Sequence, residues 1–218
     1  QGTVMDAAGD GIAGVGLKLC RGLACRNGAT DSSGAFAFND IEVDWHSFEV
    51  VPPTDSNFAT VLVPLVFAAD EVRDIPAVLL DLDAATAMPA SPTEVSAGEG
   101  LYITLSGADL EPPLFVDPAT EVAGVRVPEA LRPPIDDIAG TVLDVWYVKP
   151  FDHKATNAGL PVRFDNLWDL ADASTLEVWV GSYDDSEWLN AGTVTVSGAE
   201  LTGTALLPLM STILLVQP

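Results

Sequence analysis

The sequence predicts an all-β fold built from two consecutive β-sandwich domains, and three observations support this. Short runs of alternating apolar and polar residues recur along the chain, separated by turn-forming residues, as in half-buried strands. No stretch shows the amphipathic repeat of 3.6 residues that a surface helix requires. With 218 residues, 48% of them hydrophobic, the chain is long enough for two small domains that each bury a core.

The first expected domain covers residues 1–82. In residues 12–20 the alternation places Val15, Leu17 and Leu19 on one face of a strand. Pro64 indicates that the strand containing it lies at a sheet edge, because proline cannot donate a ladder hydrogen bond. Strands are expected at residues 2–5, 12–20, 25–30, 35–38, 47–51, 58–67 and 75–82.

The order of motifs in this stretch resembles the carboxypeptidase regulatory-like domain, which is a transthyretin-like sandwich. The motifs are GTV at residues 2–4, GIAGV at 11–15, TDSSGAFAF at 30–38 and FEVVPP at 48–53. The resemblance implies that the segment Asp31-x-x-Gly34-x-Phe36 is a tight turn between adjacent strands. It also implies an accessory module in a surface or secreted setting, and it brings no catalytic residue with it.

Cys20 and Cys25 are predicted to form a disulfide. They flank four residues between two strand-like runs, where a hairpin brings their Cβ atoms within bonding range. The spacing C-x4-C is not that of a redox motif, and no second Cys or His pair completes a zinc site. A disulfide favours an oxidising, extracytoplasmic location. No signal peptide is present and the chain starts at Gln1 rather than methionine, so we expect a processed or trimmed mature form, which is compatible with export.

Residues 83–100, rich in Ala, Ser, Thr, Pro and Gly, are expected to link the two domains. Residues 101–218 are expected to form a second, Ig-like sandwich, because the phrase LEVWVGSYDDSEWLNAGTVTVSG at 176–198 resembles the C-terminal β-sandwiches of secreted or surface proteins of bacteria. The apolar run 205–216 is shorter than a membrane span and is predicted to be a buried strand or pair of strands.

The chain carries 32 acidic against 9 basic residues, a formal charge of −23. Such a charge repels phosphate groups, so nucleic acid and anionic membranes are not expected as partners. The composition has two explanations, solubility in salty surroundings or calcium binding.

Calcium would need oxygen ligands that converge on turns at one end of a sandwich. Two candidate sets exist, which are Asp6, Asp10 and Asp31, and Asp184, Asp185 and Glu187. The turn at residues 6–11 lacks the third-position ligand and the downstream glutamate of an EF-hand loop. Solvated acidic turns are therefore the alternative explanation for both sets.

No catalytic residue is predicted. His46 and Glu49 have the spacing of a zinc signature, but residues three apart lie on opposite faces of a strand. His153 follows an aspartate, yet no G-x-S-x-G nucleophile motif and no glycine-rich phosphate loop is present. The sequence therefore favours a non-enzyme.

Tryptophans form the remaining candidate binding group. Trp179 alternates with Leu176, Val178 and Val180 in a way that points it away from their face, and Trp188 follows the next acidic turn. An outward aromatic ring can stack on a sugar or anchor a protein interface, and it can equally be covered by a loop.

We therefore expect a non-catalytic, secreted or cell-surface structural or interaction protein of bacteria, including a subunit of an extracellular assembly or filament. Its partners would be proteins or further copies of itself, joined by β-augmentation through residues 58–67 or the C-terminal run. The alternatives are a carbohydrate-binding module that uses exposed tryptophans and an accessory domain of a larger secreted enzyme.

Overall fold

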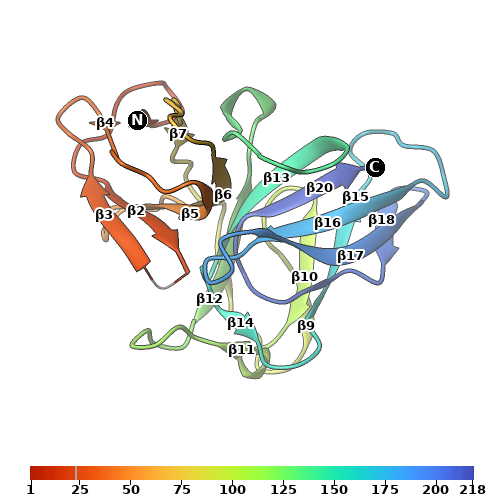
Figure 1. Ribbon diagram of the computed structural model, residues 1–218. Coiled ribbons are helices and arrows are strands. Elements are labelled where there is room, and N and C mark those ends of the chain that lie inside the picture. The colour runs from red at the N-terminus through yellow and green to blue at the C-terminus, as the bar shows by residue number, and fades with distance from the viewer. Residues whose placement is uncertain (23) are drawn as a thin grey trace. The chain divides into compact units, whose positions relative to one another are not determined.

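A computed structural model gives the structure of residues 1–22 and 24–218, an all-β fold with 47% of the residues in strands and 3% in helices, as predicted (Figure 1). The strands form two compact units. Unit 1 consists of Gln1–Asp81, Val127–Ile138 and Gly181–Trp188, and unit 2 of Leu82–Arg126, Ala139–Val180 and Leu189–Pro218. Unit 1 thus includes two short stretches from the second half of the chain, one of which contains the 3₁₀ turn η2 (Glu129–Leu131).

Unit 1 contains a four-stranded antiparallel sheet with the strand order β3-β2-β5-β6. Its members are β2 (Gly16–Arg21), β3 (Ala24–Ala29), β5 (Asp44–Val51) and β6 (Val61–Phe67). A smaller sheet has the order β4-β1-β7 and comprises β1 (Gly2–Met5), β4 (Ala35–Phe36) and β7 (Ala77–Val78). The edge position that Pro64 predicted is confirmed, because β6 ends the larger sheet.

The core of unit 1 follows from the alternation in β2 and β5. Leu17 and Leu19 pair with Val50 and Phe48 in the register, so all four side chains lie on one face and are buried. Phe36 of the smaller sheet stacks on Phe48 with ring centroids 5.4 Å apart. This stacking joins the two sheets of unit 1 through one apolar layer.

The turn at Asp31–Gly34 is the sharpest local feature of unit 1. The Asp31 carboxylate accepts hydrogen bonds from the hydroxyl and N–H of Ser33 and from the N–H of Ala35, which lower its pKa below the ordinary value. Gly34 has φ of 80°, and a Cβ there would lie 2.4 Å from the carbonyl oxygen of Val4. Only glycine fits this position, so the expected tight turn is present.

Unit 2 is organised around one eleven-stranded sheet that curls into a near-barrel. The strand order is β8-β12-β13-β20-β16-β17-β18-β15-β10-β9, and β19 pairs with β15. The strands are β8 (Thr86–Ala87), β9 (Thr93–Ser96), β10 (Leu101–Leu105), β12 (Glu121–Arg126), β13 (Thr141–Lys149), β15 (Leu160–Asp165), β16 (Thr175–Gly181), β17 (Trp188–Ser197), β18 (Glu200–Gly203), β19 (Leu206–Leu207) and β20 (Ile213–Gln217). The 3₁₀ turn η1 (Gly107–Asp109) precedes β11 (Leu110–Glu111), which pairs with β14 (Lys154–Ala155).

The apolar C-terminal run lies inside this sheet. β20 is hydrogen-bonded to β13 on one side and to β16 on the other, and its first four residues are buried. The expectation of a buried strand is therefore confirmed. The accompanying expectation that this run offers a free edge is wrong, because both edges of β20 already have partners.

Candidate functional site

A disulfide joins Cys20 of β2 to Cys25 of β3 in unit 1. The two cysteines are direct cross-strand partners, with Cα atoms 4.0 Å apart. The bond lies at the turn end of the hairpin, one pair before Arg21 and Ala24. Cys20 is buried and Cys25 is exposed, so the bond runs from the sheet to its surface.

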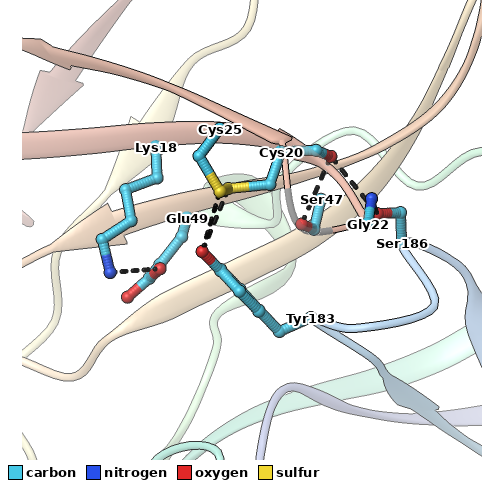
Figure 2. Close-up of a disulfide and its surroundings, with 8 residues drawn as sticks. All are labelled: Lys18, Cys20, Gly22, Cys25, Ser47, Glu49, Tyr183 and Ser186. Carbon is cyan, nitrogen blue, oxygen red and sulfur yellow. Dashed lines mark hydrogen bonds and ion pairs between the residues drawn. A yellow bond between two sulfur atoms is a disulfide. The ribbon is translucent and has the colours of Figure 1, made fainter.

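The side chain of Tyr183 contacts both sulfur atoms of the disulfide (Figure 2). Its hydroxyl lies 3.0 Å from Sγ of Cys20 and 3.1 Å from Sγ of Cys25. A disulfide sulfur carries no proton, so the tyrosine hydroxyl is the donor. Residues 181–188, which include Tyr183, thus cover the disulfide face of this sheet.

The same face carries an ion pair beside Tyr183 (Figure 2). Lys18 Nζ lies 3.0 Å from Oε2 of Glu49 and 5.7 Å from the centroid of the Tyr183 ring. Glu49 is buried, and Lys18 is the neighbouring cation that compensates its charge. This pairing has no free nucleophile or base, so its role is structural.

A second contact holds the turn of the hairpin. Ser186 donates its hydroxyl to the carbonyl oxygen of Cys20 at 3.2 Å and accepts the N–H of Gly22 at 3.3 Å (Figure 2). Ser47 of β5 reaches the same carbonyl at 3.5 Å. Together with the disulfide, these bonds fix the end of β2 from which β3 begins.

β3 is an exposed edge strand (Figure 1). All six of its residues are exposed, and in the sheet order it has a neighbour only on the β2 side. Val15 and Thr30 form the pair that follows Gly16 and Ala29 in the register. The N–H of Thr30 donates to the carbonyl of Val15 at 3.1 Å, so this is a hydrogen-bonded pair. Hydrogen-bonded and non-hydrogen-bonded pairs alternate along an antiparallel ladder.

The alternation shows which groups of β3 face outward. The pairs of Cys20 with Cys25, Lys18 with Asn27 and Gly16 with Ala29 are non-hydrogen-bonded. The N–H and C=O groups of Cys25, Asn27 and Ala29 therefore point away from β2. These groups form the strand-accepting edge, the name used below for the outer side of β3.

The opposite edge of this sheet, on β6, is blocked at Val66, so the expectation of strand addition through residues 58–67 is wrong at this position. Val66 of β6 donates its N–H to Oδ2 of Asp136 at 2.9 Å, and its carbonyl accepts from Arg73 at 3.3 Å. Arg73 and Asp136 also form a two-pronged ion pair, with Nη2 and Oδ1 2.6 Å apart. Side chains thus occupy the positions at Val66 that an added strand would use.

The charge of the hairpin differs from that of the rest of the chain. Residues 11–30 include Lys18, Arg21 and Arg26 but no acidic residue, so all 32 acidic residues lie elsewhere. Arg21 pairs with Glu42 and Asp44. Arg26 donates instead to the main-chain carbonyls of residues 39 and 40. The strand-accepting edge is therefore free of acidic side chains in a protein of charge −23.

A second exposed surface lies on unit 2, in the loop between β11 and β12. Leu114, Phe115 and Val116 are 86%, 105% and 49% exposed, and prolines precede and follow them at 112, 113 and 118. Contiguous exposed apolar side chains of this kind favour contact with another molecule. Nothing in the structure identifies that molecule.

The residues considered for calcium make local turn contacts. Asp6 accepts the N–H groups of Ala8 and Asp10, and Asp185 accepts the hydroxyl of Ser182. Asp31 closes its own turn, and Glu187 accepts the N–H of Ser182 through its carbonyl. In residues 1–22 and 24–218, no group of three or more His, Cys, Asp or Glu side chains is arranged to hold a metal ion, and this includes Asp184.

The two candidate tryptophans differ in exposure. Trp179 is half-buried and donates its indole N–H to Glu177 at 2.9 Å, whereas Trp188 is 6% exposed. A sugar platform needs an open ring face, which Trp188 does not offer.

The two histidines lie in different units, and each contacts a main-chain carbonyl group. His46 is buried, lies edge-on to Phe67 and donates its Nδ1–H to the carbonyl of Asp44. Glu49 pairs with Lys18 on the opposite face of β5. His153 of unit 2 is buried and contacts the carbonyl of Phe151.

Sequence reasoning missed Tyr183 and Asp136, which complete the disulfide face and the closed edge. Both lie more than sixty residues from their partners, and each sits in a polar loop with no recognisable motif. The one available signal was the aromatic residue in the acidic turn of residues 182–187, and it did not specify a contact.

No helix among the described residues has the length and apolar character needed to cross a membrane. No family model, no curated protein and no solved structure matches the chain.

Proposed function

We propose that the protein is a non-catalytic structural or interaction protein of the cell surface or extracellular space that associates by strand addition. The observation that carries the proposal is the strand-accepting edge of β3, whose three outward-facing residues leave main-chain donors and acceptors without a neighbouring strand. Such an edge binds an extended segment through main-chain hydrogen bonds.

The disulfide supports both the location and the mode of binding. Structural disulfides persist in oxidising compartments, which favours export. A bond across β2 and β3 also keeps the edge strand in place before a partner arrives, so less conformational entropy is lost on association. Natural sheets usually blunt a long exposed edge, as β6 does at Val66, and β3 lacks such a device in the described structure.

The finer assignments belong to the same proposal. Residues 1–82 would be a carboxypeptidase regulatory-like module and residues 101–218 an Ig-like one, joined by residues 83–100, in a bacterial surface protein. The motifs at residues 2–4, 11–15, 30–38 and 48–53 support the first assignment, and the strand pattern of residues 176–198 supports the second.

Residue-resolved amide hydrogen exchange on dilute, non-reduced protein tests whether the edge is open. The amides of Cys25, Asn27 and Ala29 are expected to exchange rapidly, while those of Ala24, Arg26 and Gly28, which face β2, are expected to exchange slowly. Slow exchange of the outward amides in a monomer would show that the edge is covered, and the proposal would be wrong.

A further inference from the structure

We infer that the partner of the strand-accepting edge is a second copy of this chain, bound antiparallel about a twofold axis at Asn27. The inference rests on the proposed function and names the partner of that site. The two four-stranded sheets would join through β3 into one continuous sheet.

The register follows from the outward-facing residues. In an antiparallel pair centred on Asn27, Cys25 lies opposite Ala29 of the second copy, Asn27 opposite its own equivalent, and Ala29 opposite Cys25 of the second copy. These are the three residues of β3 whose N–H and C=O groups face outward. Each pair exchanges two hydrogen bonds, so the contact supplies about six. The edge is self-complementary, as a twofold interface requires.

The distribution of charge also favours contact through β3. Two molecules of charge −23 repel each other wherever acidic residues meet. The hairpin of β2 and β3 lies within residues 11–30, which contain no Asp or Glu, and its Lys18 and Arg21 are paired with carboxylates of their own chain. The approach of two β3 strands therefore brings no carboxylate of either strand against the other.

Side-chain size permits the approach. β3 has the sequence ACRNGA, and Arg26, its one long side chain, is held by the carbonyls of residues 39 and 40. In the proposed register Arg26 lies opposite Gly28 of the second copy, which adds no side chain of its own and over which the Phe38 ring packs, 3.2 Å from the position of a Cβ. The remaining edge strands of the described structure are less suitable. β6 is capped at Val66, β9 has four residues, and β4, β7, β8, β11 and β14 have two residues each.

Two substitutions at Asn27 distinguish the loss of a main-chain hydrogen bond from the loss of the asparagine side chain. Asn27→Pro removes the outward N–H without removing a bond to β2, and proline is tolerated at such edge positions. Asn27→Thr keeps the N–H and has good strand propensity, so it is the matched control. The Pro variant loses two of the six hydrogen bonds about the axis, and we expect its dimerisation constant to fall about tenfold or more.

The experiment measures the mass of each non-reduced protein by light scattering over a range of protein concentrations. It is done at about 0.15 M and at about 1 M salt, because the electrostatic screening length falls from about 8 Å to about 3 Å between them. Amide exchange of Cys25, Asn27 and Ala29 is followed on the same wild-type samples, so the result does not depend on the folding of a variant. The expected result is a dimer of twice 22.8 kDa for the wild type and for Asn27→Thr, dimerisation of Asn27→Pro only at about tenfold higher concentration or more, and slowed exchange at these three amides on dimerisation.

Each other outcome overturns a defined part of the account. An Asn27→Pro dimer as tight as the wild-type dimer, or a wild-type dimer whose outward β3 amides remain fast, contradicts pairing through β3. A wild-type monomer with fast β3 amides contradicts the second copy as partner and leaves the strand-binding function in place. A monomer with slow β3 amides contradicts the inference and the proposed function together.

Discussion

Single residues decide which edge of the four-stranded sheet is open. Burial raises the pKa of Asp136, but hydrogen bonds from Arg73 and from Val66 N–H, together with the Arg73 charge, outweigh burial and leave the pKa below its ordinary value. The carboxylate is therefore held in its charged form at the edge of β6. A charged, hydrogen-bonded side chain at this place both stabilises unit 1 and blocks strand addition.

Replacing Asp136 by Asn is expected to lower the free energy of unfolding by about 1–3 kcal/mol at neutral pH, since hydrogen bonds to a charged group are lost. The lowered pKa means that this stabilisation is present above the unfolded-state pKa and is lost as pH falls through the folded-state pKa. Urea unfolding at about pH 7 and about pH 3 checks this, with the exposed Asp55→Asn as control. An equal difference between wild type and Asp136→Asn at both pH values would contradict it.

The disulfide offers a second test at this scale. Replacing Cys20 and Cys25 together by Ala is expected to lower the free energy of unfolding by about 2 kcal/mol, because the closed loop is short. Reductant should lower the stability of the wild type by a similar amount and leave the double variant unchanged. Denaturant unfolding with and without reductant measures both, and a double variant as stable as the oxidised wild type would refute a stabilising role.

At the scale of elements, the loop between β11 and β12 keeps apolar side chains in solvent. Serine at both Leu114 and Phe115 is expected to change the free energy of unfolding by no more than about 0.5 kcal/mol, since neither side chain is buried. Leu105→Ser, at a fully buried position in the same unit, is the contrasting control and should cost about 2–5 kcal/mol. Chemical denaturation compares them, and a large loss in the loop variant would show that the loop packs against the protein.

The strands of unit 1 could be predicted because local pattern determines them. Alternation located β2, Pro64 placed β6 at an edge, and the turn chemistry of Asp31 and Gly34 was visible in sequence. The capping of β6 by Asp136 could not be predicted, because it depends on a contact across seventy residues that no local pattern encodes. The same holds for Tyr183 on the disulfide.

Unit 2 shows a different limit of sequence reasoning. Its all-β character was predictable, yet the pairing order of its strands was not, because several apolar strands of similar length compete for the same neighbours. The C-terminal run illustrates this, since apolar character alone does not distinguish a central strand from an edge strand. Its place between β13 and β16 removes it as a binding edge.

At the scale of the whole molecule, net charge opposes association and the β3 edge favours it. Repulsion between two chains of charge −23 weakens as salt shortens the screening length, whereas main-chain hydrogen bonds are affected far less. We therefore predict that dimerisation strengthens with ionic strength. Light scattering over a salt series measures this, and dimers that dissociate as salt rises would indicate attraction between opposite charges instead.

The most direct test of the central claim is amide exchange along β3 as protein concentration rises. We predict that exchange slows at Cys25, Asn27 and Ala29 as the mass doubles, while Ala24, Arg26 and Gly28 remain slow throughout because they face β2. Doubling of the mass with no change at the first three amides would contradict association through the edge of β3.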